Sequence, residues 1–152
     1  MTAISGVFKV GDEIEVNGYE GDNNLCFYVA TVSRLYQRSA DIIFRDLKTG
    51  NGEPLLDRVP LQLLRPKPGV FTYDYKCGDA VEMWENERWY KRKFICISYR
   101  PKVYCEIYHP EGDDTVFCLR PNLRPCHEWC LKEGVSVWKH KRLIQAAAFP
   151  CD

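Results

Sequence analysis

Aromatic and basic side chains alternate in one short run, Arg88-Trp89-Tyr90-Lys91-Arg92-Lys93, and two further cations, Arg100 and Lys102, follow it. Rings interleaved with cations suit single-stranded nucleic acid, because bases stack on the rings and phosphates contact the cations. A solvated strand face has the same composition, and we favour that interpretation. The formal net charge is zero, whereas indiscriminate binding to nucleic acid needs a clustered positive field.

Four possible zinc ligands lie close together in the last third of the chain: Cys118, Cys126, His127 and Cys130. Thiolates and imidazole are good ligands for zinc. The spacing does not match a structural site, because the chain has no second close cysteine pair. We therefore expect no metal and no cofactor. Nothing in the sequence indicates secretion, so we expect all eight cysteines to be reduced thiols.

Catalytic motifs are not visible in the sequence. The three histidines, His109, His127 and His140, lie in no motif with a nucleophile and an orienting acid. Such groups also assemble in space, so sequence alone does not settle the matter. The sequence has no glycine loop that could cradle a phosphate. We predict that the protein is not an enzyme.

An internal repeat determines how these residues are arranged. Three landmarks recur in the same order, at offsets that drift from 67 to 59 residues: Phe8–Val16 as Tyr75–Met83, Phe27–Val32 as Trp89–Phe94, and Leu64–Pro66 as Leu123–Pro125. A repeat of this kind predicts two copies of one small unit.

Each copy consists of short runs rich in Val, Ile, Phe, Tyr and Trp, separated by Gly, Asn, Asp and Pro, which is typical of strands and turns. The expected strands are Glu13–Val16, Phe27–Leu35, Asp41–Phe44, Pro54–Arg58, Ala80–Trp84, Trp89–Ser98, Lys102–Tyr108 and Thr115–Leu119. Short strands bury more surface, and expose fewer edges, when they close into a barrel. Copies of about 55 residues bury little surface alone, so we expect the two barrels to pack together.

These patterns predict an all-β protein with a defined order of units. The first barrel spans residues 8–66, a linker 67–74, the second barrel 75–138 and a tail 139–152. The tail ends in three alanines before Phe149, so we expect a short C-terminal helix within Lys139–Ala148 that docks on a barrel.

The ordered landmarks resemble the tandem Agenet domain of plant chromatin proteins, a Tudor-like member of the Royal superfamily. The matching segments are Lys9–Val16, Phe27–Val32, Gly52–Asp57, Leu64–Pro68, Gly78–Glu82, Trp89-Tyr90, Tyr108–Pro110 and Leu123–Trp129. The resemblance covers roughly residues 8–138. It implies two small β-barrels that bind a ligand without catalysing a reaction. It also implies a nuclear protein, since relatives bind methylated lysine on histone tails through cages of aromatic rings.

In Tudor-like barrels the cage rings lie at the end of the first strand, the start of the second and the end of the third. In the second copy these positions match Trp84, Tyr90 and Tyr108, with Trp89 replacing Tyr90 if the strand phase shifts by one residue. Two acids follow Tyr108 and could hold a proton of mono- or dimethyl-lysine: Glu111 and Asp113. The same rings could instead fill the barrel core, which is the more frequent role of Trp and Tyr.

The first copy offers fewer rings at the same positions. Its candidates are Tyr28 (or Phe27) and Phe44, with Tyr19 in the loop after the first strand. Three acids give this copy an acidic rim that suits the basic flanks of a histone tail: Glu20, Asp22 and Asp46. A structural barrel with a solvated acidic face is the alternative.

The sequence therefore predicts a non-catalytic, monomeric nuclear protein that binds a methylated histone tail peptide. The alternative is a pair of barrels that binds RNA or another nuclear protein without reading methylation. No membrane association is expected, because no apolar run approaches the roughly 18 residues that cross a bilayer.

Overall fold

The computed structural model describes residues 7–19, 25–68, 74–98, 104–109, 114–132 and 135–140. The described part of the first copy forms five strands: β1 (Glu13–Tyr19), β2 (Leu25–Leu35), β3 (Ser39–Lys48), β4 (Pro54–Pro60) and β5 (Leu64–Pro66). The second copy forms the equivalent five: β6 (Ala80–Glu85), β7 (Arg88–Ser98), β8 (Tyr104–His109), β9 (Asp114–Cys118) and β10 (Leu123–Pro125). Short 3-10 helices, η2 (Leu61–Leu63) and η3 (Arg120–Asn122), precede β5 and β10. The prediction of an all-β protein is confirmed.

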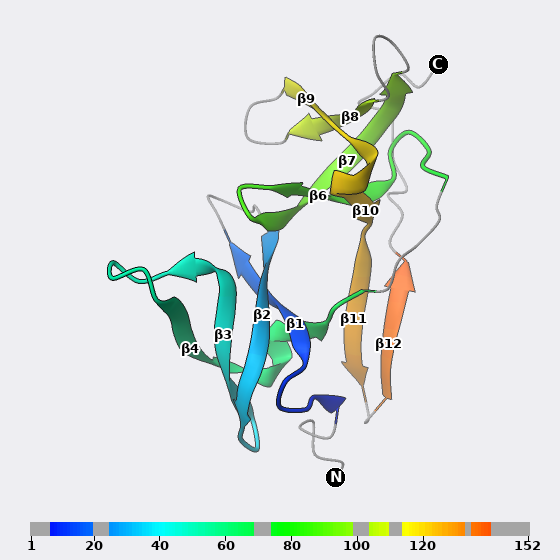
Figure 1. The fold of residues 1–152 in the computed structure, drawn as a ribbon. Coiled ribbons are helices and arrows are strands. Elements are labelled where there is room, and N and C mark those ends of the chain that lie inside the picture. The colour runs from blue at the N-terminus through cyan, green and yellow to red at the C-terminus, as the bar shows by residue number, and fades with distance from the viewer. Residues whose placement is uncertain are drawn as a thin grey trace.

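The two copies share one antiparallel sheet. Its continuous path runs β10-β6-β7-β2-β1-β5, while β3 and β4 extend from β2, and β8 and β9 extend from β7. The copies meet where β2 pairs with β7, through Cys26 opposite Tyr90 and Phe27 opposite Trp89. Figure 1 shows the two long strands β2 and β7 meeting end to end between the two units.

The turn that opens each copy is built in the same way. In both, a lysine N–H donates to an aspartate Oδ2 three residues later at 2.9 Å, from Lys9 to Asp12 and from Lys76 to Asp79. The glycines of these turns, Gly11 and Gly78, have φ of +94° and +91°, a conformation that glycine adopts without steric cost. The same backbone bonds then tie the turns to Val32 and Phe94, which makes these two residues structural counterparts.

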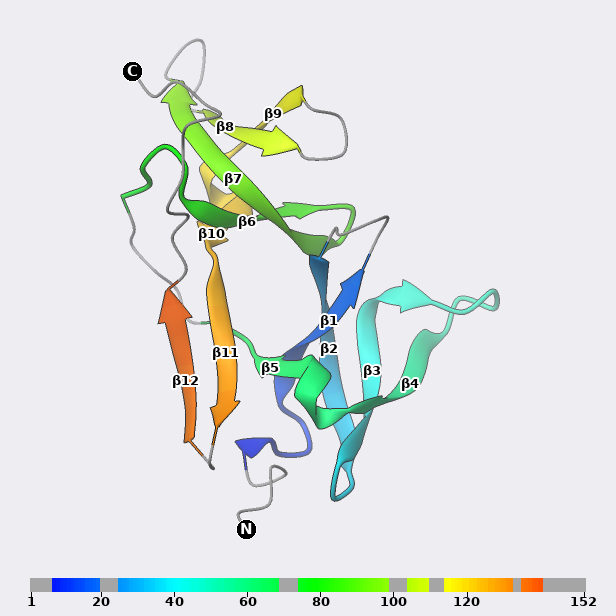
Figure 2. The same ribbon diagram turned by 180° about the vertical axis from the view of Figure 1, so that it is seen from behind.

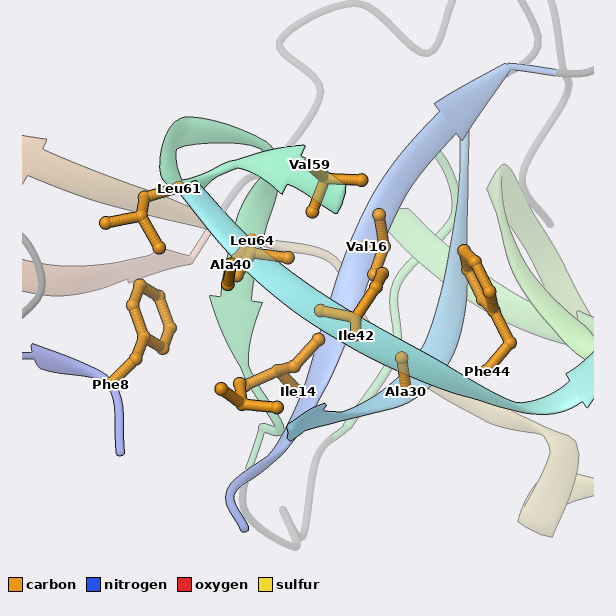
Figure 3. Close-up of a cluster of buried hydrophobic side chains, with 11 residues drawn as sticks. Phe8, Ile14, Val16, Ala30, Ala40, Ile42, Phe44, Val59, Leu61 and Leu64 are labelled. Carbon is orange, nitrogen blue, oxygen red and sulfur yellow. The ribbon is translucent and has the colours of Figure 1, made fainter. Parts of the chain in front are cut away.

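Each copy has its own hydrophobic core. The first includes Phe8, Ile14, Val16, Ala30, Val32, Ala40, Ile42, Phe44, Val59, Leu61 and Leu64 (Figure 3). The second includes Val81, Met83, Phe94, Cys105, Ile107 and Leu123. These side chains alternate along the strands with residues on the opposite face, as expected when one sheet face is buried in a barrel.

A separate hairpin follows the second copy. Strand β11 (His127–Lys132) pairs with β12 (Val135–His140), with Trp129 opposite Trp138. The predicted helix is wrong at its first two residues, because Lys139 and His140 belong to β12; its remainder lies outside the described residues. The β-branched alternation Val135-Ser136-Val137 favours a strand, and β11 supplies the hydrogen-bond partners. The expectation that all cysteines are thiols is also wrong for Cys77, which forms a disulfide.

Four charged side chains join the two copies in the interior. Glu15 and Glu82, one from each copy, are both 1% exposed, and they lie with Arg65 and Arg124. Arg65 donates from Nε to Glu15 of its own copy at 2.9 Å and through both Nη atoms to Glu82 at 3.0 and 2.6 Å. Arg124 mirrors this, donating from Nε to Glu82 at 2.8 Å and through both Nη atoms to Glu15 at 2.7 Å.

An aromatic ring lies against each arginine of this four-residue cluster. The Arg65 guanidinium is 3.3 Å from the centroid of Phe27, and that of Arg124 is 3.9 Å from Trp89. Burial opposes the charge of Arg65, but the attraction of Glu82 and Glu15 outweighs it, so the pKa of Arg65 is raised. Each arginine of the cluster bonds to a glutamate of both copies.

We predict that Arg65→Met destabilises the protein by about 3–5 kcal/mol, because it leaves a buried carboxylate without its bidentate partner. The control is Arg58→Met, which removes an exposed ion pair with Asp41 and should change stability little. Chemical denaturation measures the free energy of unfolding of both variants. Equal losses in the two variants would contradict a special role for the cluster.

Candidate functional site

The second copy does not bring its predicted rings together as one group. Trp84 lies opposite Trp89 across β6 and β7, with ring centroids 5.3 Å apart and planes at 61°. Both indoles already lie near guanidinium groups, since Arg45 is 5.3 Å from Trp84 and Arg124 is 3.9 Å from Trp89. The pair therefore belongs to the junction between the copies and shares a sheet face with the buried cluster.

A groove of about 220 Å³ runs along this junction. Its walls are Glu13, Glu15, Val29, Arg45, Lys67, Trp84, Trp89, Pro121, Asn122 and Arg124. At its edge Glu13 lies 3.3 Å from the Lys67 ammonium and 3.9 Å from Arg45. The groove thus combines two indoles with more cations than anions.

Tyr90 points to the opposite face of β7 from Trp89. It lies opposite Met83, is 3% exposed, and its pKa is raised by burial. The Arg92 guanidinium is 4.7 Å from its ring, and the Arg92 side chain is 1% exposed. An internal cation therefore already occupies the region beside Tyr90.

Tyr108 is not the counterpart of Phe44. Val32 pairs with Ile42, and its counterpart Phe94 pairs with Ile107. One residue further along each strand, Ile43 therefore corresponds to Tyr108, and two residues further Phe44 corresponds to His109. Tyr108 is half-buried and lies opposite Lys93.

Five predicted site residues lie wholly or partly outside the described part of the structure. Four acids lie outside the described residues: Glu20, Asp22, Glu111 and Asp113. Tyr19 ends β1, but its side chain is not described.

The first copy does bring two predicted rings into contact. Tyr28 and Phe44 have centroids 5.9 Å apart and planes at 84°. Phe44 is buried in the core and Tyr28 is half-buried against it. Two residues after Phe44, the Asp46 carboxylate is 26% exposed and lies 2.9 Å from Arg45 Nε. The two rings are therefore nearly perpendicular to each other, and a carboxylate follows Phe44 on the same strand.

Local sequence explains the position of Tyr28. It lies opposite Val16 on the core face of β1 and β2. Gly18 adjoins the ring so closely that a Cβ there would be 2.7 Å from Tyr28 Cε2. Glycine is needed at position 18 because a larger side chain would clash with Tyr28, and not because of its backbone conformation. Burial raises the pKa of Tyr28 to about 12, and Cys26 adds to the effect, so the ring is a neutral phenol at physiological pH.

One pair of counterparts separates the two copies most clearly. Ala30 lies opposite Phe44 in the first copy, and its counterpart, two residues before Phe94, is Arg92. The first copy has a methyl group where the second has a buried guanidinium. Sequence reasoning missed Arg92 because it was grouped with a basic run, although its parity with Tyr90 already placed both on one face.

The groups around Tyr28 and Phe44 in the described residues suit binding better than nucleophilic chemistry. The thiol nearest to Tyr28, Cys26, has its pKa raised by burial, which leaves it un-ionised and a weak nucleophile. In the described ranges no three His, Cys, Asp or Glu residues cluster as metal ligands. The same ranges contain no helix that is long and apolar enough to cross a membrane.

The raised pKa of Tyr28 predicts a loss of stability in alkali. The folded protein retains this proton up to about pH 12, whereas an unfolded tyrosine loses it near pH 10. Stability should therefore fall as pH rises from about 10 to 12. In Tyr28→Phe this part of the fall should disappear. Denaturation at a series of alkaline pH values measures the difference, and parallel curves for both proteins would refute the prediction.

The sequence matches no family model and no curated relative. Solved structures that are similar to about nine-tenths of the chain include two Agenet proteins. One is AGD34 of AGDP1 from Arabidopsis thaliana, at 24% identity over 91% of this chain and 93% of that chain, with a TM-score of 0.77. The other is the tandem Agenet domain 3-4 of ADCP1, at 23% identity over 90% of each chain, with a TM-score of 0.73. The predicted fold is thereby confirmed: the chain has the same fold as these solved tandem Agenet domains, with two small β-barrels packed together.

Proposed function

We propose that this protein is a non-catalytic reader that binds a peptide bearing methylated lysine, as found in histone tails, in the chromatin of the nucleus. The binding site is Tyr28 and Phe44 in the first barrel. The observation that carries the proposal is the perpendicular contact of these rings, at a position where the first barrel has Ala30 and the second has a buried arginine.

The chemistry of the ligand matches such a corner. A methylated ammonium is a diffuse cation with apolar methyl groups, and ring faces attract its charge without requiring a hydrogen bond. The neutral state of Tyr28 preserves a hydroxyl donor at the rim.

Asp46 is the candidate acid for this site. A mono- or dimethyl-lysine keeps at least one N–H, which a carboxylate can accept. The present partner of Asp46 is Arg45, whose side chain is 51% exposed. An exposed pair of this kind is worth little, so a ligand ammonium can replace Arg45 at low cost.

The second barrel is less suited to the same ligand. A methyl-lysine beside Tyr90 would lie next to the buried charge of Arg92, 4.7 Å from that ring. Like charges in a region of low dielectric repel each other strongly. The second barrel instead supports the junction through Trp89 and Glu82.

An interaction scaffold is the second candidate function. The observation in its favour is the junction groove, where Trp84 and Trp89 lie among Arg45, Lys67 and Arg124. Rings with cations suit RNA or an acidic protein partner. Such binding should weaken steeply with salt and should not depend on methylation.

Calorimetric titration with methylated and unmodified histone peptides tests the proposed function. Tyr28→Ala should weaken binding of the methylated peptide by about tenfold, since a desolvated cation–ring contact is worth about 1–2 kcal/mol. The matched control is Trp84→Ala, a half-buried ring of the second barrel, which should leave the affinity unchanged. Flat traces for every peptide would refute the proposal. Loss of binding in Trp84→Ala but not in Tyr28→Ala would show that the site lies in the second barrel.

Gly18→Ala tests the placement of Tyr28 without removing a ring. The added methyl should displace Tyr28, weaken binding several-fold and cost about 1–3 kcal/mol of stability through overpacking. The control is Gly50→Ala, because a Cβ at Gly50 meets nothing within 4 Å. The readouts are peptide affinity and thermal unfolding. Unchanged affinity in Gly18→Ala would show that the ligand does not contact Tyr28.

A further inference from the structure

Arg88 of the second barrel lies beside the Tyr28 ring of the first barrel. Arg88 is the first residue of β7 and follows a two-residue turn, Asn86-Glu87, with φ of +51° and +63°. Positive φ at both central residues is typical of the tight type I′ hairpin. Figures 1 and 2 both show this hairpin of β6 and β7 at the end of β2.

Arg88 contacts Tyr28 in two ways. Its guanidinium carbon is 4.9 Å from the Tyr28 ring centroid, and its Nη1 donates to the Tyr28 hydroxyl at 3.2 Å. The same guanidinium is 6.0 Å from the ring of Tyr90. Its Nε donates to the Asn86 carbonyl oxygen at 3.0 Å, so the tight turn itself orients the side chain. A built-in cation thus lies beside the aromatic ring that the proposed ligand needs.

We propose that Arg88 competes with the ligand for Tyr28 and so sets the affinity of the site. The inference rests on the proposed function and deepens it. A ring face accommodates one cation at close range, and a second positive charge beside it is repelled. A methyl-lysine can therefore occupy Tyr28 only after Arg88 has moved away. The apparent affinity is then reduced by the fraction of time that Arg88 leaves the ring free.

Comparison with Arg92 shows why Arg88 can move. The Arg92 side chain is 1% exposed beside Tyr90, whereas Arg88 is only half-buried. Arg88 donates to the neutral oxygens of Asn86 and Tyr28, and Arg92 likewise donates to the neutral carbonyl oxygen of Lys91, so burial is what distinguishes the two arginines. Turning into solvent costs a half-buried arginine less than it would cost the buried Arg92. Arg88 is therefore a displaceable cation and Arg92 is a fixed one.

The competition acts only on ligands that use Tyr28. A trimethyl-lysine peptide must displace Arg88, but an unmodified peptide that binds through its flanks does not. Removing the charge of Arg88 should therefore strengthen binding of the methylated peptide alone. A merely structural contact would have the opposite consequence, because its loss could only loosen the junction.

The test compares wild type with Arg88→Gln, Arg88→Lys and Lys91→Gln by calorimetry. The probes are one histone peptide with a single trimethyl-lysine and the same peptide unmodified. Arg88→Gln should bind the methylated peptide about three- to tenfold more tightly, with unchanged affinity for the unmodified one. Arg88→Lys keeps the charge and should resemble wild type. Lys91→Gln, on the opposite face of β7, removes one charge without touching Tyr28 and should have no effect.

Each other outcome overturns the inference. Equal or weaker binding by Arg88→Gln, with wild type still binding, refutes the competition and leaves the proposed function intact. A similar gain in Lys91→Gln, or for the unmodified peptide, would mean that net charge alone is responsible. If no variant binds the methylated peptide, the proposed function fails and the inference fails with it.

Discussion

The structure depends on the buried cluster of two arginines and two glutamates. Each carboxylate would be costly to bury in one barrel alone, because the arginine of its own copy binds one of its oxygens, Oε1, through Nε and Nη2. The bidentate bonds come from the other copy. Charges taken out of water are tolerated only when such bonds are complete, so the barrels must meet in one relative position. The cluster therefore specifies an arrangement more than it adds stability.

The relative position of the two barrels determines which residues lie beside Tyr28 and Tyr90. Phe27 and Trp89 are counterparts and pair with each other, so the copies are related by an approximate two-fold axis at this pair. The same axis brings the β6–β7 hairpin to Tyr28 and places Cys26 beside Tyr90. Symmetry alone would make the two sites alike. The two sites differ because two pairs of counterpart positions hold different residues. Ala30 of the first copy corresponds to Arg92 of the second, and Cys26 corresponds to Arg88.

The repeat could be predicted from the sequence, and with it the opening turns, the strands and the pairing of barrels. The site was harder, because a shift of one residue moves a side chain to the other face of a strand. For this reason the sequence could not decide whether Tyr90 or Trp89 faces the proposed cage. For the same reason Tyr108 was matched with Phe44, although Phe44 corresponds to His109. The two arginines of the cluster lie in a repeated segment, Leu64-Arg65-Pro66 and Leu123-Arg124-Pro125. No local sequence pattern, however, reveals that Arg65 contacts Glu82 of the other copy.

Four of the arginine–ring contacts in this fold have different consequences. Arg65 on Phe27 and Arg124 on Trp89 are held by carboxylates and join the copies. Arg92 beside Tyr90 is buried and fills one barrel. Arg88 beside Tyr28 is half-exposed and donates to neutral oxygens. All four contacts join a guanidinium to a ring, so the difference lies in their surroundings. Carboxylates hold Arg65 and Arg124 in place, burial holds Arg92, and the half-buried Arg88 is the one that can leave its ring to a ligand.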